Sequence, residues 1–274
     1  MYYWRLYVDL TASCIVKNSF TKTCVDKQAV AGAFGRAASR YDATAKLQQQ
    51  TGEYLMKMAQ PEDTGNWVLD AGCGTGFFSE HWKQKGKQVI ALDLSAGMLS
   101  HAKGLQVADY YLQGDIENLG LADNSVDVCF SNLAVQWCNE LPRVLQEFHR
   151  VTRPGGLILF STLAQGSLWE LEAAWKQVDD YRHINQFLPL QAIADACQSY
   201  RSQIRHQQYN QRYPQLLPLL NSLKGIGATH LHHGRQQGLM TRKRMNALSE
   251  AYPKNNGDYP LSYQIVFGVI YCDK

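Results

Sequence analysis

The stretch LDAGCGTGFF at residues 69–78 places Gly72, Gly74 and Gly76 on alternate positions directly after a short apolar run. Residues 67–72 have the pattern of a buried strand, and residues 76–85 are predicted to form a helix. A strand, a glycine-rich turn and a helix build a nucleotide site at the carboxyl edge of an open α/β sheet. Glycine permits the tight turn and lets a ligand lie against the backbone. The stretch therefore predicts an α/β fold with a nucleoside-type ligand at this turn.

The spacing of the glycines and the acid before them separate two ligand classes. The dinucleotide pattern G-x-G-x-x-G needs a glycine at position 77, which is Phe77. Asp70 would face a pyrophosphate's negative charge at close range, which is unfavourable. An acid suits a cation instead, and S-adenosylmethionine carries an ammonium and a sulfonium but no phosphate. We expect Asp70 to hold the amino-acid tail of S-adenosylmethionine, and the alternative that it only caps the loop stays open.

Two further acids follow the next two predicted strands. Asp93 lies in the strand 88–95, 17 residues after Gly76, where a carboxylate can accept both ribose hydroxyls. Asp115 follows a strand at 109–113 and can accept from an adenine amino group while Ile116 packs on the ring. Taken singly, each acid is typical of an ordinary loop. Their order after successive strands predicts an adenosine site.

Strand and helix patterns alternate throughout residues 66–164, which indicates a parallel sheet covered on both faces. Further strands are predicted at 125–132 and 157–164. A helix over 141–153 is expected to stop at Pro154-Gly155-Gly156. Ser95 is expected to cap the helix that follows the second strand.

The segments on either side of this region have a different pattern. Residues 27–59 predict two or three helices, with Gly52 as a possible break. After residue 165 we expect helices and then a return to strand, which gives a sheet closed by late antiparallel strands. The helices are expected within 167–200, 214–224 and 241–251, and the strand at 263–271. The predicted organisation is an extension at 1–24, a core at 25–164, a mainly helical insertion at 165–254 and a closing strand at 255–274.

Composition places the chain among ordinary globular enzymes. The 274 residues are 45% hydrophobic and 19% charged, with no apolar stretch long enough to cross a bilayer. Seven scattered cysteines without a CxxC pair indicate reduced thiols and a cytoplasmic location. The first 24 residues are apolar, but Arg5, Asp9 and Lys17 interrupt them, so we expect a loosely ordered extension rather than a signal peptide.

Positive charge gathers late in the chain, where residues 201–254 hold nine Lys or Arg and one acid, Glu250. This pattern is typical of a solvated face or of a docking surface for an acidic partner. Nucleic-acid binding is not favoured, because few aromatic residues are interleaved with the basic ones. The run HLHH at 230–233 has no acid or cysteine at a suitable spacing, so we expect no metal.

Four motifs resemble the class I S-adenosylmethionine-dependent methyltransferases. They are VLDAGCGTG at 68–76, ALDLS at 91–95, GDIENLGL at 114–121 and VTRPGG at 151–156. The resemblance implies a Rossmann-like, seven-stranded, mostly parallel sheet with a helical cap after strand five. It is specific for the cofactor and says little about the methyl acceptor.

Other segments resemble the malonyl-[acyl-carrier-protein] O-methyltransferases of biotin synthesis, among them AFGRAASRYD at 33–42, SLKGIGATHLHHGR at 222–235 and YPLSYQIVFGVIY at 259–271. The resemblance implies methyl transfer to the free carboxylate of a malonyl thioester on an acidic acyl carrier protein. A carboxylate with a pKa of about 4 is already ionised at neutral pH, so no general base is expected. Catalysis then depends on orientation.

Residues and resemblance together predict a site in two parts. The substrate carboxylate would be held by Arg182, Lys224 or Arg235, with the choice open, because a guanidinium or ammonium can pair with it. Trp137 either lines the acyl pocket or belongs to the core, and Tyr41 either closes over the cofactor or packs in a helix. The predicted cofactor contacts are Asp70, Gly72, Gly74, Gly76, Asp93, Leu94, Asp115, Ile116, Asn132 and Tyr41.

The main alternative is another small-molecule methyltransferase of the same class, such as a C-methylating enzyme of quinone synthesis. Such an enzyme would share the core motifs but should lack the resemblance at 222–231. Amino methylation of nucleic-acid bases is not favoured, because Asn132-Leu133-Ala134-Val135 stands where those enzymes often have N-P-P-Y.

Overall fold

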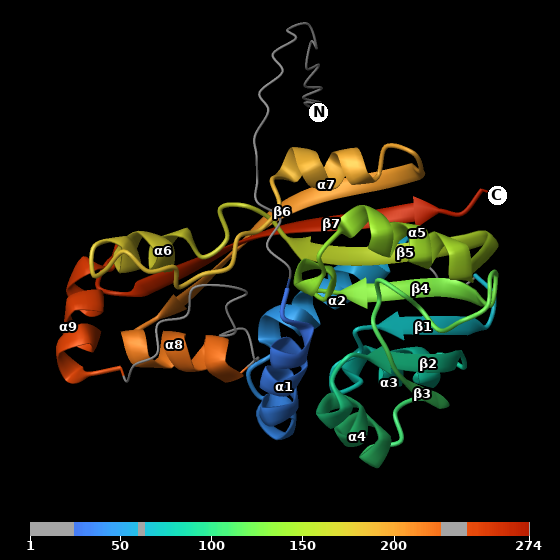
Figure 1. Cartoon of the computed structure of the whole chain (residues 1–274), viewed down its shortest axis with the longest axis horizontal. Coiled ribbons are helices and arrows are strands. Elements are labelled where there is room, and N and C mark those ends of the chain that lie inside the picture. The colour runs from blue at the N-terminus through green and yellow to red at the C-terminus, as the bar shows by residue number, and fades with distance from the viewer. Residues whose placement is uncertain (1–24, 60–63, 226–239, 274) are drawn as a thin grey trace, which may run out of the picture.

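The computed structural model describes residues 25–59, 64–225 and 240–273. Within them, seven strands form one sheet in the order β3-β2-β1-β4-β5-β7-β6 (Figure 1). The first five strands run parallel, and β7 is antiparallel to both of its neighbours. The predicted seven-stranded, mostly parallel α/β sheet is confirmed. The strands are β1 (Trp67–Ala71), β2 (Gln88–Asp93), β3 (Tyr110–Gln113), β4 (Val126–Asn132), β5 (Thr152–Leu163), β6 (Arg201–Tyr213) and β7 (Tyr259–Tyr271).

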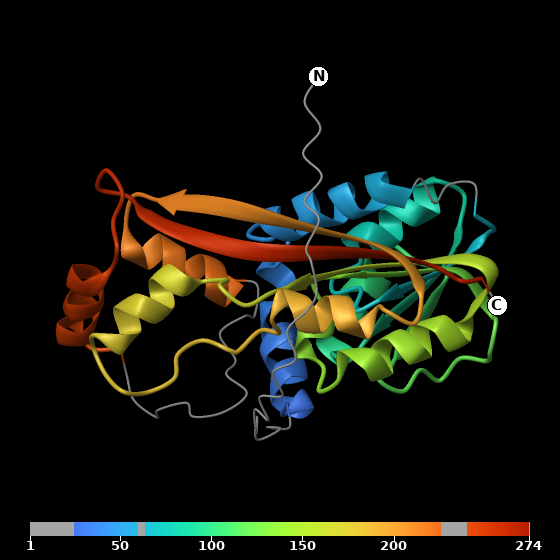
Figure 2. The ribbon, with the colours of Figure 1, turned by 90° about the horizontal axis from the view of Figure 1, so that it is seen from above.

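Helices cover both faces of the sheet (Figure 2). On one face lie α2 (Lys46–Ala59) and α3 (Phe77–Gln84), and on the other α5 (Leu141–Val151) and α7 (Leu190–Ala196). Successive residues of β1 alternate between the two cores, with Val68 in the first and Leu69 in the second. Beside β2 and β3 lies α4 (Ala96–Gly104), and α1 (Lys27–Ala37) and the short helix η1 (Ala38–Arg40) pack against it.

The last two strands extend well beyond the rest of the sheet (Figure 1). β6 and β7 pair along their whole length, whereas β7 pairs with β5 only over 265–271. Around the protruding part pack α6 (Trp169–Lys176), α8 (Leu216–Gly225) and α9 (Arg242–Ala251), which we call the distal lobe. The sequence pattern did not indicate β6, because its exposed edge position leaves RSQIRHQQYNQRY mostly polar.

Two predicted breaks lie inside regular elements. Gly52 does not interrupt α2, and a Cβ there would come 2.1 Å from the Phe78 ring, so this glycine lets α2 approach α3 closely. α5 ends at Val151, before the Pro-Gly-Gly sequence, which lies inside β5 at a register irregularity where Gly155 has φ +78°. The predicted cap is confirmed, since the Ser95 side chain accepts from the amide of the third residue of α4.

Three expectations concern residues outside the described ranges: the loosely ordered extension at 1–24, the HLHH run at 230–233 and Arg235. Among the described helices, none is both long and apolar enough to span a membrane.

Candidate functional site

The glycine-rich turn between β1 and α3 needs glycine at each of three positions. Gly72, Gly74 and Gly76 have φ values of +81°, +58° and +87°, a region that side chains rarely adopt. A Cβ on Gly72 would lie 2.4 Å from the Ala134 side chain, and one on Gly76 would lie 2.3 Å from Val107. A Cβ on Gly74 would meet no atom within 4 Å. The turn is therefore packed at its ends and open in its middle.

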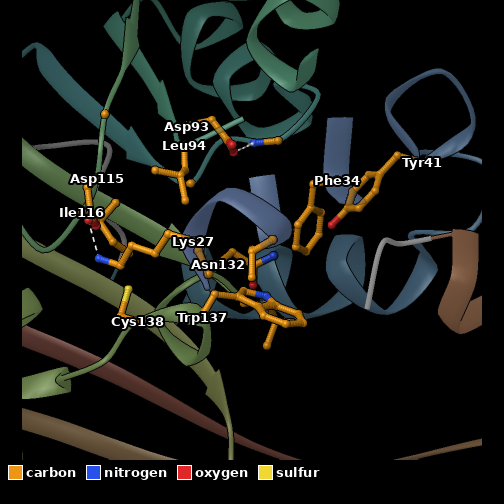
Figure 3. Close-up of a pocket in the computed structure, with 16 residues that line it drawn as sticks. Lys27, Phe34, Tyr41, Asp93, Leu94, Asp115, Ile116, Asn132, Trp137 and Cys138 are labelled. Carbon is orange, nitrogen blue, oxygen red and sulfur yellow. Dashed lines mark hydrogen bonds and ion pairs between the residues drawn. The ribbon is translucent and has the colours of Figure 1, made fainter. Parts of the chain in front are cut away.

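A pocket opens beside this turn at the carboxyl ends of β1 to β4 (Figure 3). The space beside the turn, including the open mouth of the pocket, is about 650 Å³. Eight of the ten predicted cofactor residues line it, whereas Asp70 and Gly76 are not among the lining residues. Its lining is Lys27, Val30, Phe34, Tyr41, Gly72, Gly74, Asp93, Leu94, Gly114, Asp115, Ile116, Asn132, Leu133, Ala134, Trp137 and Cys138.

Asp93 lies at the end of β2 with its carboxylate held by backbone groups. The Gly74 amide donates to Oδ2 at 2.9 Å, and the Ser95 amide donates to Oδ1 at 2.7 Å. Burial raises the pKa of Asp93 in spite of these bonds. A carboxylate has about four lone-pair sites, so two amide bonds leave acceptor capacity on a group that lines the pocket.

Asp70 lies behind the turn and is 3% exposed. The Ser79 hydroxyl on α3 donates to its Oδ2 at 2.6 Å. Burial, and to a smaller extent the charge of Asp93, raises the pKa of Asp70 to about 7. Neither of these carboxylates has an ion-pair partner in the part of the chain that the structure describes. Two acids without an ion-pair partner among the described residues, the buried Asp70 and the half-buried Asp93, fit a cationic ligand such as S-adenosylmethionine and not a pyrophosphate.

At the end of β3, Asp115 meets a residue that the sequence analysis did not consider. Lys27 on α1 donates to the carboxylates of Asp115 and Glu117 (Figure 3 shows the first contact). Burial alone would lower the pKa of Lys27, but the two carboxylates outweigh it and raise the pKa. Lys27, Val30 and Phe34 follow helical spacing, so one face of α1 forms a wall of the pocket.

Aromatic rings form the opposite end of the pocket. Phe34 contacts Trp137 edge to face, with ring centroids 5.3 Å apart, and Tyr41 at 6.3 Å. Trp137 belongs to the short helix η3 (Val135–Trp137) and lines the pocket rather than the core. Burial and the charges of Asp93 and Asp42 raise the pKa of Tyr41, so its hydroxyl stays protonated.

Asn132, at the end of β4, makes three side-chain hydrogen bonds to neighbouring elements. Its Oδ1 accepts from Thr51 Oγ1 at 3.0 Å and from Ser161 Oγ at 2.7 Å, and its Nδ2 donates to the Gln48 carbonyl at 2.8 Å. Asn132 therefore fixes the wall of the pocket between α2 and β5. Leu133, which follows it, has φ +49°, a conformation uncommon outside glycine.

The predicted substrate residues do not gather at this pocket. Arg182 and Lys224 are exposed, and neither lines it. Several basic residues of 201–254 have local partners: Arg201 pairs with Asp273, Arg244 pairs with Asp179, and Lys254 lies over the Tyr259 ring. In the described ranges, no group of three or more His, Cys, Asp or Glu side chains is placed to hold a metal ion.

Comparison with known structures supports the fold. YcgJ of Bacillus subtilis superposes with a TM-score of 0.56 at 17% identity, covering 82% of this chain and 99% of that one. The [4+2]-cyclase SpnF superposes with a TM-score of 0.51 at 17% identity, covering 82% and 80%. Because one of these neighbours is a cyclase, the fold alone does not decide the reaction.

Sequence comparison is more specific. Residues 69–160 match a methyltransferase domain family. The malonyl-[acyl-carrier protein] O-methyltransferase of Yersinia pestis is 61% identical over 249 residues, which cover 91% of this chain and 93% of the relative. Proteins with the same name from Pectobacterium atrosepticum and Salmonella typhimurium are 56% and 46% identical, covering 90% and 91% of this chain and 98% and 99% of the relatives. The chain belongs to the malonyl-[acyl-carrier protein] O-methyltransferase family of S-adenosylmethionine-dependent methyltransferases.

Proposed function

We propose that this chain transfers the methyl group of S-adenosylmethionine to the free carboxylate of malonyl-acyl carrier protein. The products are the malonyl methyl ester and S-adenosylhomocysteine, and the reaction is an early step of biotin synthesis. The observation that carries the proposal is the identity of 46–61%, over 90% or more of the chain, to relatives of that name.

The pocket supports the cofactor half of the proposal. Asp93 would accept the ribose hydroxyls and Asp115 the adenine amino group, while Leu94 and Ile116 would pack against the ring. Gly72 and Gly74 would let the amino-acid portion lie against the turn. The buried Asp70 would act on the cationic tail through its charge, because it does not line the pocket. Tyr41 and Asn132 would close the remaining wall.

Methyl transfer to a carboxylate requires orientation of the two reactants more than it requires proton transfer. When bound, S-adenosylmethionine supplies a methyl group on a sulfonium, and the acceptor carboxylate, with a pKa of about 4, is already ionised. Two protonated groups line the pocket, since burial raises the pKa of both Tyr41 and Cys138. Neither can act as a base near neutral pH, but the Tyr41 hydroxyl can donate. The apolar walls from Phe34 and Trp137 would exclude water from the reacting pair.

The acceptor half is our inference from chemistry. The sequence candidates for holding the malonyl carboxylate are Arg182, Lys224 and Arg235; because Arg182 and Lys224 do not line the pocket, either would have to hold the carboxylate from outside it. The acidic carrier would dock on the basic residues of 201–254. We expect neither a nucleic acid nor a membrane as partner. The described cysteines are free thiols, which suits the predicted cytoplasmic location. If the carrier docks through charge, salt should slow turnover of the carrier-bound substrate more than that of a small malonyl thioester.

The decisive experiment is transfer of radiolabelled methyl to malonyl carrier, with acetyl carrier as the control. We expect label on the malonyl form alone, and mild alkali should release it as methanol because a methyl ester hydrolyses. Equal labelling of acetyl carrier, which has no free carboxylate, would refute the proposal. Alkali-stable label would instead indicate a C-methyltransferase.

A further inference from the structure

Lys27 occupies an unusual place for a lysine, at the first residue of α1 and in the wall of the pocket (Figure 3). Its side chain is 23% exposed and its ammonium lies between two carboxylates, those of Asp115 and Glu117. Asp115 lines the pocket, whereas Glu117 is buried behind it at 5% exposure. The three groups connect α1 to the loop after β3, at the end of the pocket that holds Ile116.

Glu117 is a fixed anchor for this ammonium. Its carboxylate also accepts from the Glu140 amide at 2.8 Å and from Asn139 Nδ2 at 3.2 Å. Its own amide donates to Asp115 Oδ1 at 3.0 Å, while Lys27 donates to Asp115 Oδ2. Each oxygen of Asp115 thus has one donor within the protein and further lone-pair capacity. The carboxylate is held in one orientation before any ligand arrives.

We propose that Lys27 is a positioning residue for the nucleobase, which holds the Asp115 carboxylate in the orientation that accepts from a 6-amino group and so makes the pocket select a 6-amino purine over a 6-oxo purine. The inference rests on the proposed function, because it takes this pocket to be the cofactor site. Held in this orientation, the oxygens of Asp115 accept from a 6-amino group and are repelled by the lone pairs of a 6-oxo group.

Removal of Lys27 would change the orientation of Asp115. The Asp115 and Glu117 carboxylates would then face each other without the ammonium between them, and their repulsion would turn Asp115 away from its present position. Asp115 would then no longer accept from a 6-amino group, so the selectivity would be lost. If Lys27 only held α1 in place, its removal would lower the affinity for both ligands by the same factor.

The test uses calorimetric affinities of the full chain for S-adenosylhomocysteine and S-inosylhomocysteine, which differ in the 6-amino and 6-oxo groups. The wild type should prefer the adenosyl ligand by about tenfold or more, a typical effect of a hydrogen bond to a charged group. Lys27→Met should bring the two affinities within about threefold, and Lys27→Arg should restore most of the preference. Lys57→Met, an exposed lysine on α2, is the matched control and should change nothing.

A double-variant cycle shows whether Lys27 acts through Asp115. Asp115→Asn should lower the preference as Lys27→Met does, and the combined variant should lower it no further. An unchanged preference in Lys27→Met, or effects that multiply in the combined variant, would overturn the inference. If Lys27→Met does not fold, Lys27→Gln takes its place, because glutamine removes the charge between the two carboxylates and keeps a polar side chain at this position. A wild type that binds neither ligand would refute the proposed function itself.

Discussion

Replacement of Asp70 by asparagine should stabilise the fold and weaken cofactor binding at the same time. Burial holds the pKa of Asp70 at about 7, against an ordinary value of 3.8. The folded state therefore binds the Asp70 proton more tightly than the unfolded state does. The stability that this proton contributes is fully present below pH 4 and is lost as pH rises through 7. Asparagine cannot ionise, so it escapes this loss.

The size of the effect follows from the two pKa values. The raised pKa of Asp70 lowers the free energy of unfolding by about 4 kcal/mol at pH 8, where Asp70 is ionised in both states, and by about 2 kcal/mol at pH 5, where it is protonated in the folded state and ionised in the unfolded state. The difference in unfolding free energy between Asp70→Asn and the wild type should therefore grow by about 2 to 3 kcal/mol from pH 5 to pH 8. Groups common to both proteins cancel in this difference.

Urea unfolding of the ligand-free proteins at pH 5, 6, 7 and 8 measures this difference. Asp180→Asn, at an exposed acid of the α6–α7 connection, is the matched control and should give a difference that does not vary with pH. Calorimetry at pH 8 should show S-adenosylhomocysteine binding to Asp70→Asn about tenfold or more weakly, because the ammonium loses a buried counter-charge. A difference in stability that stays constant with pH would refute the assignment of a raised pKa to Asp70.

Three other substitutions test the packing and the pocket. Gly52→Ala would place a Cβ 2.1 Å from the Phe78 ring. We therefore expect thermal unfolding to show a loss of about 1–3 kcal/mol in stability, although alanine favours a helix. A gain in stability would contradict the close approach of α2 and α3. Gly76→Ala should lower the free energy of unfolding more than Gly86→Ala does. Both glycines have positive φ, but only a Cβ at position 76 would meet a neighbouring side chain. Equal losses of stability would show that backbone strain, and not this contact, dominates. Asp93→Asn should weaken S-adenosylhomocysteine binding by about tenfold or more with an unchanged circular dichroism spectrum, and full affinity would remove Asp93 from the site.

The strands that carry the cofactor motifs could be predicted from sequence because each is a short apolar run that ends at a glycine or a polar residue. β1, β2 and β4 are buried on both faces, so their residues form near-continuous apolar runs. β2 ends at Asp93 and β4 ends at Asn132. β6 gave no such signal, since an exposed edge strand tolerates polar residues at most positions. Local pattern also could not show that Gly52 faces Phe78, because that contact joins residues distant in sequence.

From the residue pattern alone, the site was predictable where function follows a strand end, and Tyr41 was added by the family resemblance. Asp93 and Asp115 stand at such ends, and the structure places both in the pocket. Lys27 lies nearly ninety positions from its partners, and a lysine at the start of a helix is typical of a solvated surface. The available signal was the helical spacing of Lys27, Val30 and Phe34, which marks one face of α1.

The long pairing of β6 with β7 has a consequence for engineering. Because β7 is shared between the main sheet and the distal lobe, the lobe cannot swing without bending a strand that is hydrogen-bonded to β5. Grafting the lobe of one relative onto another therefore requires the two-stranded ribbon of β6 and β7 to be transplanted with it. Junctions at 165 and 258 would move β6 with the lobe and leave β7 behind, which separates two strands that pair along their whole length. Chimaeras that respect this ribbon should fold, and those cut through it should not.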